Sequence, residues 1–324
     1  MSASSSAKTS TAAVPARAAL AGNPSDGYGG GVVATVVPGM TATVTVQPAS
    51  WFRVGGVEFE QIGDIPRGER LGDATEVGDA ALFLAAIAVA NQRWPVSPCT
   101  IDWSTSIPRS VGLAGSSALV LATLNALADA NHQTIAAHDL PMLALEAEQL
   151  LGITAGLQDR VAQSFGGTQS MTFPGTPPFT QRSLQPACPL DLVVLWDTTA
   201  AEPSQRFHGE LRRRYDDGEA AVHHAMSALA DAAQAAEEAL ETGNHEQLGA
   251  AMGTSFALRS SISDLSPSHV ALVDLARSHD VPANYAGSGG AVIGLLSRED
   301  SAKNLARSAK EKGLGFHRWK VSEN

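Results

Sequence analysis

Apolar residues recur at helical spacing along several segments of the chain. In one of them, Leu119, Ala122, Ala126 and Ala130 would share one buried face of a helix. The same spacing and the helix start and stop signals predict helices over residues 76–94, 116–130, 138–151, 217–241, 245–259, 267–279 and 303–313. Apolar and β-branched runs predict strands over residues 32–37, 41–46, 101–106, 168–173, 190–196 and 315–321, with Pro38 and Gly39 as the turn of a hairpin between the first two.

The composition limits the kinds of partner. The 324 residues suffice for one large or two ordinary domains, and a formal charge of −11 argues against nucleic acid or an acidic membrane as the main partner. No apolar run reaches the roughly 18 residues of a membrane span. Residues 1–13 are rich in Ser, Thr and Ala and lack the apolar core of a signal peptide, so we expect a disordered tail and a cytoplasmic protein. Cys99 and Cys188 are too few for a disulfide framework and are expected to be buried thiols.

A glycine-containing loop leads directly into the helix predicted at residues 116–130. Pro108 fixes its entry, Gly112 and Gly115 permit tight turning, and Ser116 and Ser117 begin the helix, where the first N–H groups lack intrahelical partners. Such a loop at a helix N-terminus can bind phosphate, because its donors and the helix dipole favour negative charge. No lysine follows the last glycine, so the loop is not a Walker A sequence. An ordinary serine cap after a turn is the alternative interpretation.

A second turn lies near the start of the chain, after Arg17. Asn23, Pro24, Ser25 and Asp26 all favour turns, and turn formation alone explains their presence. The functional interpretation is a substrate loop, in which Asp26 accepts hydrogen bonds from hydroxyl groups and Arg17 offers a cation.

Two pairs of charged residues are candidates for a catalytic site. Glu146 and Glu148 lie two positions apart on a predicted helix, so one should be solvated while the other can face the phosphate loop. Asp159 and Arg160 lie in an apolar stretch that ends at Gly166 and Gly167. An adjacent Asp and Arg usually form a surface pair of little energetic value, but this context argues for a constrained site.

Two further stretches have open interpretations. Gly287, Ser288 and Gly289 precede a predicted strand and indicate a tight bend, which could be a hairpin turn or a close approach to a ligand. Arg212–Arg214 belong to a basic run that is either a solvated helix start or a clamp for a carboxylate or phosphate. His223 and His224 have no metal-ligand partner at helical spacing and are expected at the surface.

Four of these stretches resemble the GHMP small-molecule kinases, and three of them match the motifs of that family in the expected order along the chain. Pro-x3-Gly-Leu-x-Gly-Ser-Ser-Ala is similar to their nucleotide loop, in the longer form of the branch that holds heptose kinases, fucokinase and glucuronokinase. Asn-Pro-Ser-Asp at residues 23–26 and the stretch 147–167 resemble glucuronokinase in particular, and the glycines at 287–290 resemble the third GHMP motif. The resemblance covers almost the whole chain after residue 14.

The resemblance implies a fold and a cofactor. The fold would be α+β in two domains: residues 14–195, like the second domain of ribosomal protein S5, and a ferredoxin-like domain over residues 196–324. ATP would lie along Pro108, Gly112, Leu113, Ala114, Gly115, Ser116, Ser117 and Ala118, with Mg²⁺ held by Ser117 and Glu148. Few carboxylates plus phosphate oxygens are typical of a magnesium site.

The resemblance also implies an acceptor and a catalytic pair. Asp159 would be the base, with Arg160 keeping it ionised, and D-glucuronate would be phosphorylated at its anomeric oxygen. The acceptor would be bound by Arg17, Asn23, Ser25, Asp26, Arg259, Gly287, Ser288 and Gly289. One departure is Ser260-Ser261, where glucuronokinase is richer in arginine, so a neutral hexose or heptose derivative is the alternative acceptor. A non-catalytic ATP- and sugar-binding regulator is the alternative from another class.

Overall fold

The computed structural model describes residues 7–60, 80–153, 156–176, 178–200 and 204–322. The chain forms two compact units, each assembled from separate segments. Unit 1 comprises Met1–Ala16, Gly39–Ile107 and Gly115–Ser164, and unit 2 comprises Arg17–Pro38, Pro108–Ala114 and Phe165–Asn324. The long strands Ser10–Ala21 and Gly31–Pro48 therefore contribute residues to both units. The glycine loop Pro108–Ala114 belongs to unit 2, and the next residue, Gly115, begins a segment of unit 1.

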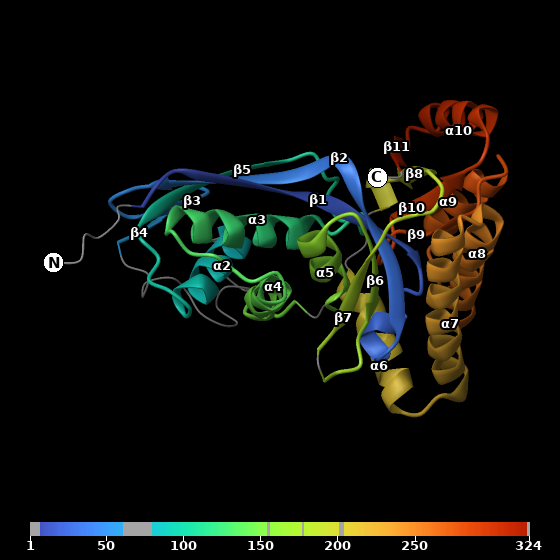
Figure 1. Ribbon diagram of the computed structural model, residues 1–324, viewed down its shortest axis with the longest axis horizontal. Helices are drawn as coiled ribbons and strands as arrows, with labels where there is room; N and C mark the ends of the chain where they lie inside the picture. Colours follow the sequence, from blue (N-terminus) through green and yellow to red (C-terminus); the bar gives the residue numbers. More distant parts are fainter. Residues whose placement is uncertain (1–6, 61–79, 154–155, 177, 201–203, 323–324) are drawn as a thin grey trace. The chain divides into compact units, whose positions relative to one another are not determined.

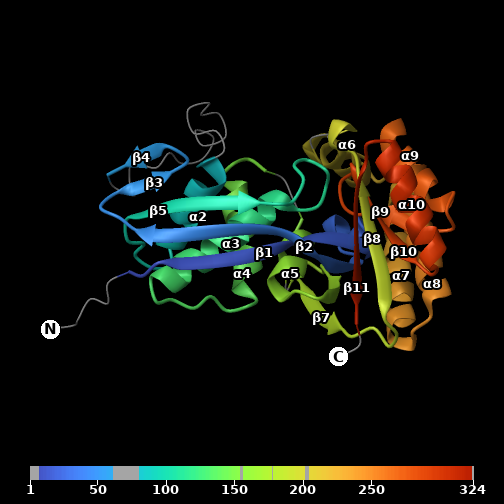
Figure 2. The ribbon, with the colours of Figure 1, turned by 90° about the horizontal axis from the view of Figure 1, so that it is seen from above.

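Unit 1 is a sheet with helices on one face (Figures 1 and 2). Its strands come from β1 (Ser10–Ala21), β2 (Gly31–Pro48), β3 (Phe52–Val54), β4 (Val57–Phe59) and β5 (Cys99–Thr105). β2 pairs antiparallel with β5, from Ala42 opposite Thr105 to Pro48 opposite Cys99, while β3 pairs parallel with β5 and antiparallel with β4. The helices α2 (Ala81–Asn91), α3 (Gly115–Ala130) and α4 (Asp139–Gln149) pack against one another, followed by α5 (Gln158–Phe165).

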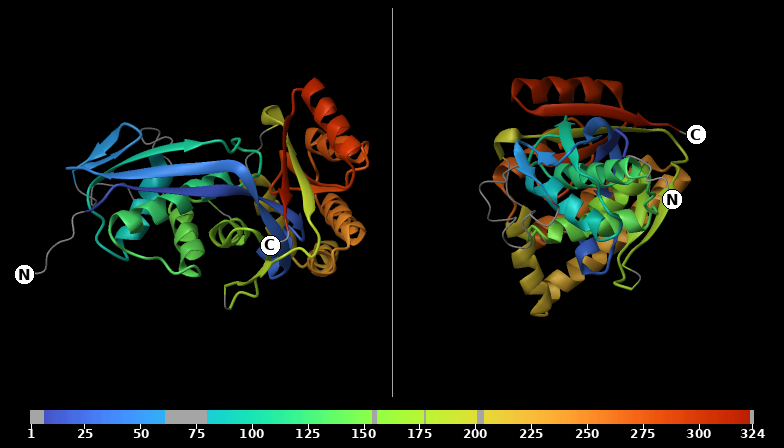
Figure 3. Two further views of the ribbon diagram at one scale, coloured as in Figure 1. Left: turned by 45° about the horizontal axis from the view of Figure 1, so that its top comes forward. Right: turned by 90° about the vertical axis from the view of Figure 1, so that its left-hand side faces the viewer.

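Unit 2 contains a four-stranded antiparallel sheet in the order β11 (Gly315–Val321), β8 (Leu190–Trp196), β10 (Ala291–Leu296), β9 (Ala283–Tyr285). Its core includes apolar side chains of β8, β10, α9 (Pro267–Arg277) and α10 (Glu299–Glu311). The first part of β2 pairs with β6 (Thr168–Thr172), which pairs with β7 (Thr180–Leu184). The long helices α7 (Ala220–Thr242) and α8 (His245–Ile262) lie side by side (Figure 3).

Most of the predicted elements are confirmed, and their ends follow the local chemistry. The strand predicted at residues 190–196 is β8, and the helices predicted at 217–241 and 245–259 are α7 and α8. Gly243, at φ +69°, ends α7, and the Asn244 side chain caps α8 by accepting from the Gln247 N–H at 3.0 Å. The helix predicted at 76–94 is observed as α2, while residues 76–79 lie outside the described part of the chain.

The hairpin predicted around Pro38 and Gly39 is wrong. β2 runs without interruption from Gly31 to Pro48, with Gly39 at φ +85° inside it. The residues before Pro38 pair with β6 and those after Gly39 pair with β5, so the two halves never face each other. A glycine of positive φ here bends a strand rather than reversing it.

The disordered tail predicted for residues 1–13 is wrong for its last part. Ser10–Ala13 begin β1, and the Ser10 hydroxyl donates to Asp129 at 2.7 Å. Small Ser, Thr and Ala residues can extend a strand once a partner strand supplies the hydrogen bonds, and β2 is that partner. Residues 1–6 lie outside the described part of the chain. The domain boundary at residue 195 stays a prediction, while the compact unit 2 begins earlier and includes β6, β7 and β8.

Candidate active site

The predicted phosphate loop, which directly precedes α3, contains three residues with positive φ angles. Ser110, Gly112 and Ala114 all have positive φ, at 57°, 75° and 60°. A left-handed conformation is costly for residues other than glycine, and such positions occur most often where a ligand or another loop fixes the backbone. α3 begins at Gly115, with Ser116 exposed and Ser117 buried, so the prediction of a loop that ends in two serines at a helix N-terminus is confirmed.

Within unit 2, this loop lies directly against the glycine stretch at residues 287–290. A Cβ atom added at Gly112 would lie 2.6 Å from the Gly289 carbonyl oxygen and 3.1 Å from the Ser288 nitrogen. A Cβ atom at Gly290 would lie 2.9 Å from the Val111 Cα. The two loops therefore meet backbone to backbone, an approach that only glycine permits. The stretch at 287–290 is therefore the loop of the hairpin between β9 and β10, and this loop also approaches the phosphate loop closely.

Two buried arginines hold these loops together. Arg17 donates from Nη1 to the carbonyl oxygens of Gly112 at 3.1 Å and Ala286 at 2.5 Å, which joins both loops to β1. Arg259 donates from Nη1 to Gly287 at 2.6 Å and from Nη2 to Ser288 at 2.7 Å. Burial lowers the pKa of Arg259 to about 10, so it remains charged at neutral pH. Both arginines thus have a structural role here, and their contact with substrate stays a prediction.

The close contact of the loops leads to a stability prediction. We expect Gly287→Ala to lower the free energy of unfolding by about 1–3 kcal/mol, because the new methyl group would lie 2.7 Å from the Arg17 Nη1 and against the Gly112 carbonyl. Gly253→Ala is the control: Gly253 lies inside α8, where an added Cβ atom would meet no other segment within 4 Å, and alanine should stabilise the helix by up to about 1 kcal/mol. Urea unfolding of both variants measures the difference, and a neutral Gly287→Ala would contradict the tight loop contact.

The predicted substrate turn is also in unit 2, as the 3-10 helix η1 (Ser25–Tyr28) and the residues before it. The Asn23 side chain donates to the Tyr285 carbonyl at 3.3 Å and accepts from Asn284 at 3.1 Å. The buried Ser25 hydroxyl donates to the Gly31 carbonyl at 2.8 Å. These contacts fix the turn against β9 and leave the half-buried Asp26 within it.

Asn284 and Tyr285 are functional candidates that were not predicted from the sequence. Asn284 also donates to the Leu20 carbonyl at 3.1 Å, and the guanidinium of Arg259 lies 4.9 Å from the centre of the Tyr285 ring. The signal that could have identified them is their place directly before the glycine stretch, where a side chain can hold both the loop and the turn.

In unit 1, α3 and α4 bring the two predicted magnesium ligands together, and α5 adds an arginine beside them. The Ser117 hydroxyl of α3 donates to Glu148 Oε1 of α4 at 3.2 Å. The guanidinium of Arg160, on α5, forms an ion pair with Glu148 and donates to the Gly156 carbonyl. The side chains of Glu148 and Arg160 are each 1% exposed. Burial of such a charged pair is costly unless it is well bonded, which indicates a constrained site.

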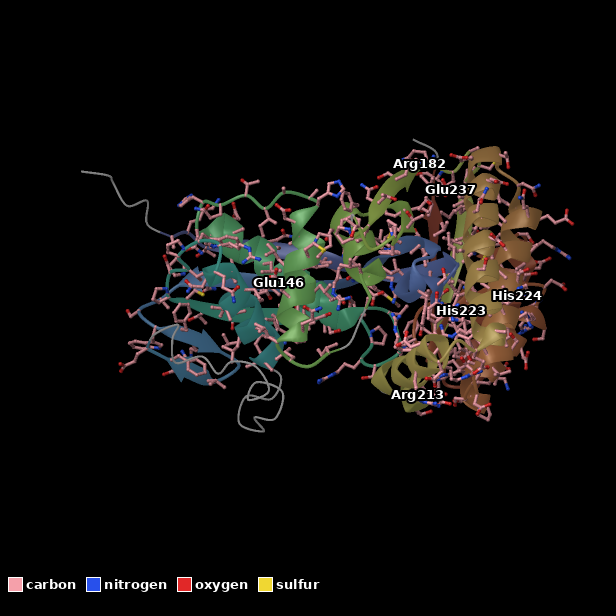
Figure 4. The ribbon with its side chains drawn as sticks, turned by 90° about the horizontal axis from the view of Figure 1, so that it is seen from below. Glu146, Arg182, Arg213, His223, His224 and Glu237 are labelled. Atoms are coloured by element: carbon pink, nitrogen blue, oxygen red, sulfur yellow. The ribbon has the colours of Figure 1, made fainter. Side chains whose placement is uncertain are left out.

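The prediction that only one of the two α4 carboxylates faces inward is confirmed. Glu146 lies on the surface, where it pairs with Arg93 at 2.8 Å and is 40% exposed (Figure 4). Glu148 points toward Ser117. The two positions differ by about 200° around a helix, so their side chains cannot share one face.

The helix α5 was not predicted, because its glycine-rich flanks indicated a turn. Its buried residues include Gln158, Arg160 and Gln163, while Asp159 is half-buried. Gln163 was missed as well; its side chain donates to the Pro15 carbonyl at 2.8 Å. The role of Arg160 in keeping Asp159 ionised stays a prediction, and the structure shows in addition an ion pair of Arg160 with Glu148.

The residues present fit a magnesium ion that is completed by phosphate. Among the described residues, no group of three or more His, Cys, Asp or Glu side chains could hold a metal ion. The hydroxyl of Ser117 and the carboxylate of Glu148 offer the oxygen ligands that Mg²⁺ prefers, and phosphate oxygens and water usually supply the others. His223 and His224 lie on the surface of α7 as expected (Figure 4).

Comparisons with known proteins show what this chain is similar to. Residues 81–167 match the GHMP kinases N terminal domain, and residues 236–314 match the GHMP kinases C terminal domain. The chain is 30% identical to probable glucuronokinase 2 of Arabidopsis thaliana, over 86% of this chain and 82% of that protein. It is 29% identical to glucuronokinase 1 of the same plant, over 95% of this chain and 91% of that protein.

The fold is also that of solved kinases. The Streptococcus pneumoniae phosphomevalonate kinase, in complex with phosphomevalonate and AMPPNP, aligns with a TM-score of 0.80 at 15% identity, over 96% of this chain and 99% of that one. This likeness confirms the predicted α+β fold in two domains. None of the helices in the described part of the chain is long and apolar enough to cross a membrane. Both cysteines are free thiols, Cys99 buried and Cys188 half-buried.

Proposed function

Because this chain belongs to the GHMP kinases and is a sugar kinase, we propose that it transfers the γ-phosphoryl group of ATP to the anomeric hydroxyl of D-glucuronate. The product would be glucuronate 1-phosphate. The observation that carries the choice of acceptor is the 30% identity to a glucuronokinase over 86% of the chain. The buried Ser117, Glu148 and Arg160 support a working phosphoryl-transfer site rather than a non-catalytic binding protein.

ATP would bind with its phosphates along residues 108–118. The backbone N–H groups at the start of α3 point out of the helix, and its dipole favours an anion there. This local attraction matters because a protein of charge −11 repels a nucleotide at long range. Ser117 and Glu148 would hold Mg²⁺, which neutralises charge on the phosphate oxygens.

Asp159 would accept the proton of the attacking hydroxyl or orient that hydroxyl for in-line attack. The transition state of phosphoryl transfer is loose, so positioning of the acceptor matters more than activation of its oxygen. Arg160 would keep the Glu148 carboxylate ionised and fixed in direction, since an opposite charge in contact favours the charged form. Asp26, with the backbone of Gly287, Ser288 and Gly289, would line the acceptor site.

The departure at Ser260 and Ser261 does not by itself favour a neutral sugar. Both hydroxyls donate to carbonyls of their own helix, at 2.8 Å to Phe256 and 2.7 Å to Leu258. The two serines therefore offer no cation, and a uronate carboxylate would need a cation from elsewhere in this chain. The proposal keeps glucuronate as the acceptor because of the identity to the glucuronokinases.

Initial rates of ADP release with glucuronate and with glucose test the proposal. We expect a higher kcat/KM for glucuronate, because a site that binds a charged group discriminates by up to about 10⁴–10⁵-fold against an analogue that lacks it. Equal or faster reaction with glucose would make this a kinase for neutral sugars. Stoichiometric binding of ATP without ADP release on any sugar would support the regulator instead.

A further inference from the structure

The proposed function leaves open which residue binds the carboxylate of a uronate acceptor, and the inference about that residue rests on the proposed function. The carboxylate of the sugar needs a cation in a protein whose own charge is −11. Arginine suits this task, since its planar fork can bond both oxygens. Arg17 and Arg259 are the obvious candidates in unit 2, but both are buried and donate to carbonyls of the two glycine loops.

Arg212, Arg213 and Arg214 lie in succession on α6 (Ser204–Asp216), and the last two are closely paired with carboxylates of the protein. Arg214 forms two hydrogen bonds of 2.7 Å with Glu219. Arg213 points outward, 68% exposed, and pairs with Asp217 one helical turn later at 3.3 Å (Figure 4). Each of these two arginines has a carboxylate within hydrogen-bond distance.

Arg212 differs because it reaches the predicted substrate turn. Its Nη2 donates to the Gly27 carbonyl, and its guanidinium lies 4.5 Å from the centre of the Tyr28 ring. Its side chain is 50% exposed, and its ion pair with Asp216 is long, at 3.8 Å. The guanidinium is thus held against the turn at Gly27 and Tyr28 by a carbonyl and an aromatic face, with half of its surface open to solvent.

The tyrosine ring that contacts Arg212 is held in place by neighbouring side chains. The rings of Tyr28 and Tyr215 are 4.7 Å apart, and Tyr215 stacks on His223 at 3.9 Å. Tyr28 and Tyr215 pack against a core cluster that includes the buried Leu211, the neighbour of Arg212. A fixed guanidinium loses less conformational entropy on binding than a mobile one.

The negative charges of Asp26 and Asp216 must be offset by a cation if an anion is to bind near Arg212. Burial, opposed by Arg212 and supported by Asp26 and Asp216, raises the pKa of Tyr28 to about 12, so the phenol stays neutral. Asp26 and Asp216 would repel a carboxylate at this turn. Arg212 is the positive group that faces the same ring.

We infer that Arg212 is the specificity-determining residue that binds the carboxylate of the sugar acid. Nη2 keeps its bond to the Gly27 carbonyl, which aims the remaining donors of the fork outward over Tyr28. A neutral sugar would gain nothing from this guanidinium, so Arg212 selects uronates over hexoses. Arg259 then acts as a positioning residue for the glycine loop and not as the partner of the carboxylate.

The test compares Arg212→Gln with Arg213→Gln, a matched control one residue away on the same helix. Each enzyme is assayed with glucuronate and with glucuronamide, an uncharged analogue of the same shape. We expect Arg212→Gln to lower kcat/KM for glucuronate about 10- to 100-fold, mainly through KM, while the value for glucuronamide stays within about twofold. Arg213→Gln should change neither. Arg212→Lys, which keeps the charge and a donor for Gly27, should recover part of the loss.

Four outcomes would overturn the inference. An equal loss on both substrates would assign Arg212 a purely structural role, as would a lost thermal transition in Arg212→Gln that Arg212→Lys restores without restoring the preference for glucuronate. Unchanged preference in Arg212→Gln would place the carboxylate elsewhere while the proposed function stands. If the unmodified enzyme reacts no better with glucuronate than with glucose, the proposed function fails, and the inference fails with it.

Discussion

Replacing Asp159 by asparagine is expected to reduce turnover about 10²–10⁴-fold while the protein folds and binds ATP normally. Asparagine has the same shape but cannot accept a proton from the acceptor hydroxyl. Asp159 lies in the first turn of α5, half-buried, next to the arginine that pairs with Glu148. Single-turnover measurements of phosphoryl transfer on the purified variant, with ATP affinity measured separately, give the effect on chemistry alone.

Asp139→Asn is the matched control for this result. Asp139 occupies the first turn of α4 in the same unit and is exposed, so both substitutions remove one negative charge from a helix N-terminus. The control should keep full turnover. Near-normal turnover in Asp159→Asn would remove Asp159 from the mechanism.

Glu148→Gln should destabilise the protein by about 3–5 kcal/mol, because it takes the carboxylate away from the buried guanidinium of Arg160. The same change should raise the magnesium concentration needed for half-maximal rate and lower phosphoryl transfer. Glu146→Gln should cost at most about 1 kcal/mol, since its pair with Arg93 is exposed. Urea unfolding and the magnesium dependence of the rate measure both effects.

Two kinds of result with the Glu146 and Glu148 variants would contradict the roles assigned to Glu148. Equal losses of stability, or the reverse order, would contradict the placement of Glu148 at the centre of the three helices. Normal magnesium dependence in a folded Glu148→Gln would leave Glu148 a structural residue. Glu148→Asp, which retains the charge on a shorter side chain, keeps the test available if Glu148→Gln does not fold.

The orientation of Glu148 was predictable because helix geometry fixes the angle between neighbouring positions. Its partner Arg160 was not, since the contact joins two helices across a turn and depends on how α5 packs. α5 itself was missed because its eight residues lie between glycines, where local propensity favours a turn. Packing of its buried residues outweighs that propensity.

Other features were predicted wrongly or not at all because they depend on contacts between residues that are distant in the sequence. Pro38 and Gly39 predict a turn from local chemistry, but the two halves of β2 have separate partner strands, β6 and β5. Arg17 and Arg259 were predicted to bind the substrate, which stays a prediction, and their bonds to loop carbonyls could not be read from spacing. For the run at residues 212–214, only side-chain geometry distinguishes Arg212 from its neighbours.

The most direct test of the central claim is the phosphorus NMR spectrum of the product formed from ATP and D-glucuronate. Transfer to the anomeric hydroxyl predicts a single new sugar phosphate whose phosphorus is coupled to the anomeric proton, in amounts equal to the ADP released. A phosphate on any other hydroxyl, or a sugar phosphate that forms with glucose but not with glucuronate, would contradict the account.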